Sequence, residues 1–581
     1  MMLFFLFFSS FLTRPRWRFV VIFFSLHTLF STLFSPLSTL HYPLSTLYSL
    51  LFRYEDVTLL AGQMECGAIV GRANPSSSLS LLIDGIQTRC RGLASLRTGA
   101  PLTSDHFGDM VTNPASTLSV TLQSHVLLDH LWWYLHFLGH LLVDANVGES
   151  PTMPQELADL SSRTSLLQHS GSDDLVVSSI ETVLILFEQE CSRVETYASG
   201  GAPPDERDGS MSPLLHTKIL WFLRRWCRAY LMPDPSLYSS GLPPTLQANY
   251  GASTERGVAV VGRILSRSTL LLCYWSDEPG VARSVLDLLK TICSHSEMRR
   301  AVVSHSSFTV LLRSYSLSVC PSLASTNNGV TNTHSTVSPM VTWMRKGVTN
   351  LSQEFVGSLS RVICLACDAS PTPEALAQNL MHAAAPAFTR LGQITTDQAS
   401  DHRSASVRQE ISRLLRILRG IAEATSMTNM TSIFDMCVPT LSGITSLLDV
   451  YHHEDQEIVF GCLDYLTHLV EGQIIHLDPL RSRALYSCVG TLLSSYSRHG
   501  LFSSWLDLSR PAMDGSVVVE QDMIAEEILM VLRIMSQFAN KKLVDWYDVV
   551  DDASQRAAEE GECFCSLLLF LFLVHFLSFF L

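Results

Sequence analysis

Between residues 117 and 540, apolar residues recur every three to four positions, and short polar stretches interrupt them. This period matches the turn of an α-helix, whereas no sustained period-two alternation with hairpin turns is found. Two clear apolar faces are Val281, Val285, Leu288, Ile292 and Val407, Ile411, Leu414, Leu418, Ile421. We therefore predict helices that begin near residues 117, 174, 213, 255, 280, 297, 337, 352, 374, 405, 429, 455, 479 and 519.

Two of these helices carry recognisable start signals. Asp277 and Glu278 precede Pro279, which suits the positive end of a helix dipole and the first helical turn. Ser406 and Gln409 have the spacing of a capping box. Each signal predicts the residue at which a helix begins.

The spacing of the helices indicates a repeat architecture. Most successive starts lie roughly 15 to 40 residues apart, so helix pairs recur at about the 40–47-residue period of HEAT-type repeats. The polar breaks at 199–213, 319–337, 395–403 and 503–516 are typical of inter-helix loops rather than domain linkers. The predicted fold class is all-α, a HEAT-like helical-repeat solenoid of antiparallel helix pairs.

The two ends differ from this body. Residues 1–53 contain no Asp or Glu and four Arg, and residues 563–581 are almost wholly apolar. They read either as membrane anchors or as translated polypyrimidine tracts, because Phe, Leu, Ser and Pro have pyrimidine-rich codons. We expect a gene-model artefact or an anchor at 1–53 and again at 563–581. Between them we expect a helical-repeat array at 54–550 and an acidic linker at 551–562.

The net charge indicates what kind of partner the chain would bind, and the cysteine content indicates the redox state of its compartment. The net charge is −14, and residues 54–581 carry −18 because the first 53 residues contribute +4. An acidic body disfavours nucleic acid and favours a basic partner, or serves solubility alone. The acidic pairs Asp277–Glu278 and Glu454–Asp455 would attract such a partner, or are solvated turns. Fourteen dispersed cysteines suit a reducing compartment, and the sequons at Asn350 and Asn429 would matter only in a secreted protein.

One segment, residues 130–150, raises the question of a metal site. His136 and His140 are four residues apart, which suits two ligands on one helix face. Zinc hydrolases with such a pair place a Glu directly after the first His, where this chain has Phe137. The apolar run Leu131–Val143 is too short to span a membrane. We predict a core or groove-lining helix with the histidines at its partly polar edge.

Other candidate motifs are weak. Cys364 and Cys367 form a single Cys-x-x-Cys without a second pair, so we expect two buried thiols that act as small hydrophobes. The run 452–457, HHEDQE, is expected to form a solvated first turn of a helix. No phosphate-binding loop, dinucleotide fingerprint or serine-hydrolase elbow occurs. The sequence therefore predicts no enzyme, no catalytic residue, no metal site and no cofactor, and leaves the partner-binding residues unknown.

Several stretches resemble the exportin-4 family, nuclear transport receptors of the importin-β superfamily. They are Leu141–Leu157, Ile219–Leu231, Ile417–Thr425 and, in its layout of helices, Leu447–Leu477. The resemblance extends over about residues 117–545, with a weaker trace back to Tyr54. It covers neither hydrophobic end.

The resemblance implies a nuclear export receptor that carries protein cargo from nucleus to cytoplasm in a Ran-GTP-dependent manner. It implies shuttling through the nuclear pore, contact with nuclear pore proteins, and basic cargo such as the hypusine-bearing translation factor, or Smad-type transcription factors. We expect this chain to bind Ran-GTP weakly or not at all, because it resembles the middle of a receptor about twice as long. Two alternatives stay open: a membrane-anchored helical-repeat scaffold, if the hydrophobic ends are genuine, and a helical scaffold for another partner.

Overall fold

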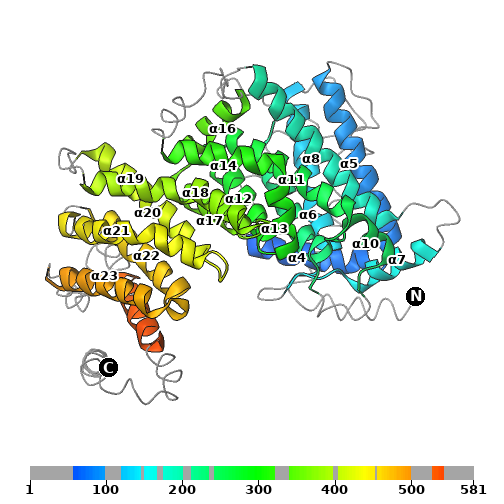
Figure 1. Cartoon of the computed structure of the whole chain (residues 1–581). Coiled ribbons are helices and arrows are strands. Elements are labelled where there is room, and N and C mark those ends of the chain that lie inside the picture. The colour runs from blue at the N-terminus through cyan, green and yellow to red at the C-terminus, as the bar shows by residue number, and fades with distance from the viewer. Residues whose placement is uncertain are drawn as a thin grey trace, which may run out of the picture. The chain divides into compact units, whose positions relative to one another are not determined.

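The helices group into two compact units, residues 1–301 and 302–581. The computed structural model describes residues 57–98, 120–145, 150–166, 174–200, 211–234, 241–320, 339–396, 404–451, 455–498 and 526–541. Within these ranges the chain is all-α apart from one isolated antiparallel bridge between Asp144 and Thr152, which confirms the predicted fold class (Figure 1). The segments 1–53, 551–562 and 563–581 lie outside the described residues.

The first unit is built from two layers of helices. One layer comprises α4 (Val57–Arg72), α6 (Val120–Leu142), α9 (Pro213–Trp226) and α12 (Pro279–Cys293), each packed on the next. The other comprises α5 (Pro75–Arg97), α8 (Leu175–Gly200) and α11 (Glu255–Tyr274). Contacts of α5 with α6 and of α11 with α12 join the layers. The smaller elements are α7 (Gln155–Leu166), the π-helix η7 (Cys227–Leu231) and α10 (Pro244–Tyr250), and α13 (Ser296–Ser304) crosses the division between the units.

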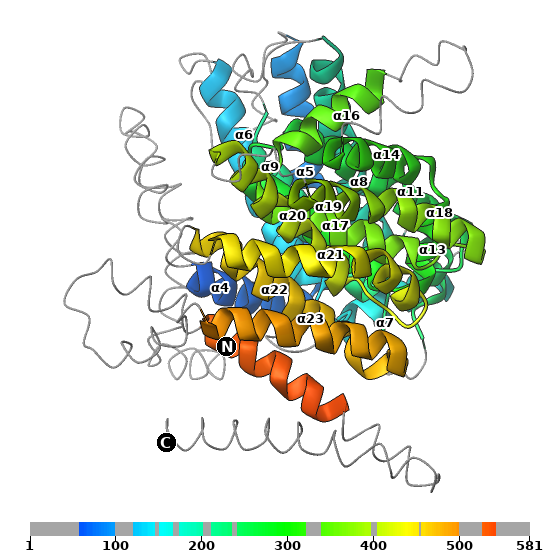
Figure 2. The same cartoon turned by 60° about the vertical axis from the view of Figure 1, so that its left-hand side comes forward.

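The second unit repeats this arrangement. One layer is α17 (Gln353–Cys367), α20 (Ala405–Glu423) and α22 (Gln456–Gln473), and the other is α19 (Ala385–Thr396), α21 (Met430–Tyr451) and α23 (Pro479–Arg498) (Figure 2). Within these layers, helix starts recur 52 and 51 residues apart and 45 and 49 residues apart, so one spacing falls within the predicted period and three lie slightly above it. The remaining elements are α14 (Ser306–Val319), α16 (Pro339–Asn350), α18 (Pro373–Ala383), η10 (Ile474–His476) and a helix over 526–541.

The predicted helix starts agree closely with the structure where a single apolar stripe exists. The starts at 213, 255, 405 and 479 coincide with the first residues of α9, α11, α20 and α23. One helix was predicted from residue 297, but the structure has two, α13 and α14. His305 separates them, because it follows the end of α13 and its side chain caps α14 by accepting the Ser307 N–H. The start at 374 also covers two, because α18 ends before Ala384 and Pro386 lies in the first turn of α19. The helices α4, α5, α7 and α10 were not predicted, and the expected start near 519 lies outside the described residues.

The two start signals have different outcomes. Glu278 is the N-cap of α12 and Pro279 its first residue, as the acidic start predicted. The capping box is wrong, because Ser404 is the N-cap of α20 and Ser406 already lies inside the helix. The hydroxyl of Ser406 lies 2.8 Å from the Ser404 hydroxyl instead of accepting a backbone N–H.

Glycines set the close approach of α17 and α20. A Cβ at Gly357 would lie 2.6 Å from the carbonyl oxygen of Arg416, and a Cβ at Gly420 would collide with the carbonyl oxygen of Gly357. Backbone therefore packs directly on backbone here, which only residues without a side chain permit. This contact holds α20 between α17 and α22 within its layer.

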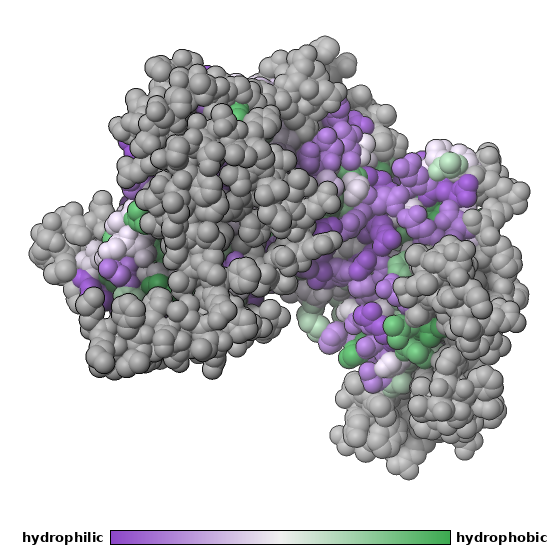
Figure 3. Space-filling view, turned by 180° about the vertical axis from the view of Figure 1, so that it is seen from behind, coloured by the Kyte–Doolittle hydropathy of each residue, from purple (hydrophilic) through white to green (hydrophobic). Residues whose placement is uncertain are grey.

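Three described helices are long and apolar enough, by length and composition, to cross a membrane: Glu255–Tyr274, Met430–Tyr451 and Gln456–His476. In this fold 67%, 56% and 72% of their apolar windows are buried, so most of that surface packs on neighbouring helices. On the face shown in Figure 3, the described residues are largely hydrophilic, with smaller groups of hydrophobic side chains among them.

Candidate functional site

Aromatic and basic side chains gather between α6 and α9 in the first unit. They recur every three or four positions along each helix, so each set lies on one helical face. We call them the α6–α9 cluster: Trp132, His136 and His140 of α6, and Lys218, Trp221 and Arg225 of α9.

Lys218 lies at the centre of the α6–α9 cluster. Its Nζ lies 2.7 Å from Nδ1 of His136 and 4.3 and 4.4 Å from the ring centroids of Trp132 and Trp221. The side chain of Lys218 is only 9% exposed. Among the described residues, no carboxylate pairs with this nitrogen. Within that part of the chain, the buried cation is therefore held by two indole faces and an imidazole.

Burial and neighbouring positive charges lower the pKa values of Lys218, His136 and His140. Burial, and then the positive charge of Arg225, lowers the pKa of Lys218 from 10.5 to about 7. Burial, and then the charge of Lys218, lowers the pKa of His136 to about 3. Burial, and then Arg225, lowers the pKa of His140 to about 3. At neutral pH both imidazoles are therefore uncharged, and Lys218 is close to the midpoint of its titration.

The C-terminal end of α6 explains why a buried and a half-buried arginine lie nearby. Arg72 of α4 donates to two of the last α6 carbonyls, at 2.6 and 3.1 Å. The hydroxyl of Tyr230 donates to a third at 2.7 Å, and Arg225 donates to the carbonyl of Val143 at 3.0 Å. A helix end leaves such carbonyls without partners and carries partial negative charge, which suits guanidinium groups. Arg72 and Arg225 thereby fasten α4 and α9 to the end of α6.

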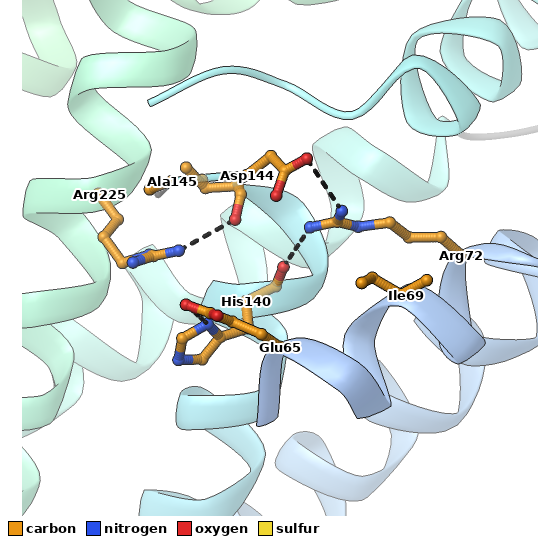
Figure 4. Close-up of a pocket in the computed structure, with 8 residues that line it drawn as sticks. Glu65, Ile69, Arg72, His140, Asp144, Ala145 and Arg225 are labelled. Carbon is orange, nitrogen blue, oxygen red and sulfur yellow. Dashed lines mark hydrogen bonds and ion pairs between the residues drawn. The ribbon is translucent and has the colours of Figure 1, made fainter. Parts of the chain in front are cut away.

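A small polar cavity borders this helix end (Figure 4). It measures about 60 Å³ and is lined by Glu65, Ile69, Arg72, His140, Val143, Asp144, Ala145 and Arg225. Glu65 lies over the imidazole of His140, with Oε1 4.0 Å from Nδ1, and Asp144 pairs with Arg72 at 3.4 Å. Such a volume holds about two water molecules, so the cavity suits bound water rather than an organic substrate.

The structure places the two candidate metal ligands inside the core. Leu131, Leu135 and Leu138 of α6 are fully buried, which confirms the predicted core helix. His136 and His140 are 6% and 3% exposed and stack on each other at 5.1 Å, so the partly polar edge on which they were predicted is buried. Within the described ranges, no group of three or more His, Cys, Asp or Glu is arranged to hold a metal ion.

The Cys-x-x-Cys pair is buried as predicted. Cys364 and Cys367 of α17 are both 0% exposed. Burial raises the pKa of the Cys364 thiol to about 12, so this thiol stays protonated. Both side chains therefore serve as small apolar groups in the α17 core.

The acidic run before α22 and one sequon have structural roles. Asp455 is the N-cap of α22, accepts the N–H of Ile458 and lies 3.7 Å from Arg408. This supports a helix-start role, although residues 452–454 lie outside the described residues. Asn429 is fully buried and its side chain bonds to the backbone of residues 424 and 426, so it is inaccessible to glycosylation in this fold.

The second unit contains a contrasting charged group, the α20–α22 ladder. It consists of Arg361 of α17, Arg416, Arg419 and Glu423 of α20, and Asp464 and His468 of α22. Asp464, which is 5% exposed, lies 3.1 Å from Arg419 and 3.8 Å from Arg416. His468 places Nδ1 3.2 Å from Asp464 and Nε2 3.3 Å from Glu423. Burial opposes protonation of His468, but its bonds to Asp464 outweigh burial and raise its pKa.

Sequence reasoning missed the basic half of the α6–α9 cluster. Lys218, Trp221 and Arg225 occupy positions i, i+3 and i+7 within a largely apolar helix, so two charges share one face with a Trp. That spacing was the available signal. Whether the face is buried depends on α4 and α6, which lie far away in the sequence.

Comparisons with known proteins agree with the resemblance noted in the sequence. The family model described as Exportin-4 matches residues 54–333, the interval that contains α4 to α14. Exportin-4 of Dictyostelium discoideum is 24% identical over 271 residues, which cover 46% of this chain. The match spans about one fifth, 20%, of the length of that relative. The resemblance of Ile417–Thr425 and Leu447–Leu477 stays a prediction. Over residues 54–333, the chain is therefore similar to the exportin-4 family.

Proposed function

We propose that this chain acts in nuclear export as a transport receptor for protein cargo and not as an enzyme. The observation that carries the proposal is the exportin-4 family match over residues 54–333, which includes the packed helices α4 to α12 of the first unit. Layered helical arrays present long surfaces to protein partners and need no catalytic centre. Shuttling between nucleus and cytoplasm, with contacts to nuclear pore proteins, follows from the same role.

The proposed partners are a basic cargo and Ran in its GTP form. The charge of −18 on residues 54–581 favours a basic cargo, such as the hypusine-bearing translation factor, mainly by raising the association rate. Smad-type transcription factors are a second proposed cargo class. Asp455 is already engaged as a cap and ion-pair partner, so the electrostatic argument rests on net charge rather than on that acidic cluster.

A binding assay with the full chain tests this proposal. The immobilised chain is offered the translation factor with or without hypusine, together with Ran loaded with non-hydrolysable GTP or with GDP. We expect more of the modified cargo to be retained, and less of either cargo as salt shortens the Debye length below about 8 Å. Because this chain is expected to bind Ran-GTP weakly or not at all, the nucleotide on Ran should change retention little. A strong increase in retention with GTP-loaded Ran would contradict that expectation. The absence of cargo retention under all conditions would overturn the receptor role of this chain.

The alternative is a membrane-anchored helical-repeat scaffold. It depends on residues 1–53 and 563–581, which lie outside the described residues. Alkaline extraction of membranes from cells that express the endogenous protein distinguishes the two functions. An integral anchor resists extraction, whereas a shuttling receptor is recovered in the supernatant.

A further inference from the structure

Lys218 differs from other described lysines in the combination of burial, aromatic contact and missing counter-charge. Lys290 of α12, for example, is exposed, whereas Lys218 is 9% exposed and lies between two indole rings. Its hydrogen-bonding partner is Nδ1 of a neutral histidine, at 2.7 Å. Arg225, two turns further along the same helix, adds a second positive charge to the same face.

This environment favours an uncharged amine or an anion in place of the ammonium group. A buried ammonium without a carboxylate partner costs free energy that deprotonation or a nearby negative charge relieves. Trp132 and Trp221 are themselves only half-buried, so the amine lies just beneath the surface. A very small neutral electrophile can therefore reach it more readily than a large acylating reagent can.

We propose that Lys218 is a carbamylation site, at which the free amine of the side chain adds carbon dioxide. The lone pair of Nζ attacks the carbon of CO₂, a C–N bond forms, one C=O π bond breaks, and the amine proton is released to solvent or to a neighbouring base. The product is a carbamate with one negative charge. No oxidant, reductant or further reactant is needed. This inference is independent of the proposed export role.

The surrounding groups favour that product. The carbamate changes the local charge from positive to negative beside Arg225 and leaves an anion where basic side chains predominate. The indole faces limit the access of water, which slows the acid-dependent loss of CO₂. The amine also meets the chemical requirement, because burial lowers the pKa of Lys218 to about 7 and leaves a large neutral fraction at physiological pH.

Trapping of the carbamate in the intact protein tests the proposal. The full chain is equilibrated with ¹³C-bicarbonate at pH 7.5, alkylated with triethyloxonium to convert carbamates into stable esters, digested and analysed by mass spectrometry. We expect the trapped fraction at Lys218 to exceed that at exposed Lys290 at least about tenfold, because the neutral fraction of an ordinary lysine is far smaller. Bicarbonate-free buffer should abolish the signal.

Two variants and a matched control distinguish carbamylation from a structural role of this lysine. Lys218→Arg keeps the charge but cannot form the carbamate, so the ¹³C carbamate resonance of the protein should lose its Lys218 component. Arg225→Gln removes the neighbouring cation and should lower the trapped fraction several-fold, whereas Arg224→Gln, on an exposed pair with Asp287, should leave it unchanged. Trapping at Lys218 no higher than at Lys290 in the folded wild-type protein would overturn the proposal.

Discussion

The α6–α9 cluster and the α20–α22 ladder bury basic side chains in opposite ways. In the ladder, Asp464 and Glu423 lie between the arginines and His468, so each half-buried positive group has a carboxylate at short range. In the cluster, the partners of Lys218 within the described part of the chain are aromatic rings and an imidazole. The difference shows that a charged side chain in these helices has opposite effects on stability, depending on whether it has a partner of opposite charge. Paired charges connect neighbouring helices, whereas an unpaired buried lysine destabilises its own charged form.

The largest expected effect comes from disturbing the close contact that brings the ladder together. Gly420→Ala places a Cβ against the carbonyl oxygen of Gly357 and forces α17 and α20 apart. We expect a loss of about 3 kcal/mol in the free energy of unfolding of the second unit. Hydrogen exchange measured on peptides from α17, α20 and α22 checks this. Gly392→Ala is the matched control, because nothing lies within 4 Å of a Cβ there. If the two variants behaved alike, the close contact would have no energetic role.

Removal of the central carboxylate of the ladder should have the next largest effect. Asp464→Asn leaves Arg416, Arg419 and His468 without their shared counter-charge. We expect about 2–3 kcal/mol of destabilisation, because one member of a buried charged group is lost while the others remain. Denaturant unfolding monitored by exchange of α20 and α22 peptides measures it. Asp287→Asn removes an exposed, paired carboxylate and should cost much less.

For the α6–α9 cluster, we expect removal of a charge to raise the free energy of unfolding rather than to lower it. Lys218→Met replaces an unpaired buried cation by an apolar side chain of similar length, and cation–π contacts are lost at the same time. We expect a net gain of about 1 kcal/mol in the free energy of unfolding at pH 6, in bicarbonate-free buffer. Exchange protection of α6 and α9 peptides measures it. A destabilisation of 2 kcal/mol or more would mean that the aromatic contacts of Lys218 outweigh its burial cost.

The pH dependence of stability should differ in sign between the two regions. The pKa of Lys218 is lowered to about 7, so between pH 7 and 10.5 the unfolded state binds more protons and stability of the cluster region rises with pH. The pKa of His468 is raised above 6.5, so its contribution is complete below pH 6.5 and is lost as pH rises through the folded value. Each slope is at most about 1.4 kcal/mol per pH unit. Stability profiles of the wild type, Lys218→Met and His468→Gln should assign each slope to its residue.

The smallest effect is expected at an exposed ion pair near the cluster. Arg224 and Asp287 lie 2.9 Å apart, and both side chains are 44% exposed. We expect Arg224→Gln to change the free energy of unfolding by less than about 0.5 kcal/mol, because solvent screens the pair and its side chains lose entropy on pairing. Chemical denaturation in low and high salt measures it. A larger change would indicate that Arg224 belongs to the buried cluster.

The sequence by itself determined the class of the fold and most helix positions. Apolar stripes with helical period fixed α9, α11, α20 and α23, since the pattern of each helix is contained in its own residues. The short α10 and the break at Ala384 were missed because a seven-residue stripe is too short to recognise and the break interrupts a continuous apolar pattern. The exportin-4 resemblance was readable from local stretches for the same reason.

Only the tertiary structure decided which charges are buried and with what partners. The contacts of Lys218 and Arg225 form only when α6 packs against α9. Arg416 and Arg419 lie off the predicted apolar face of α20, and Asp464, 48 and 45 residues further on, pairs with both. The energy of a charge depends on its surroundings, and those surroundings come from other helices. Local sequence therefore specified the helices, and packing specified their chemistry.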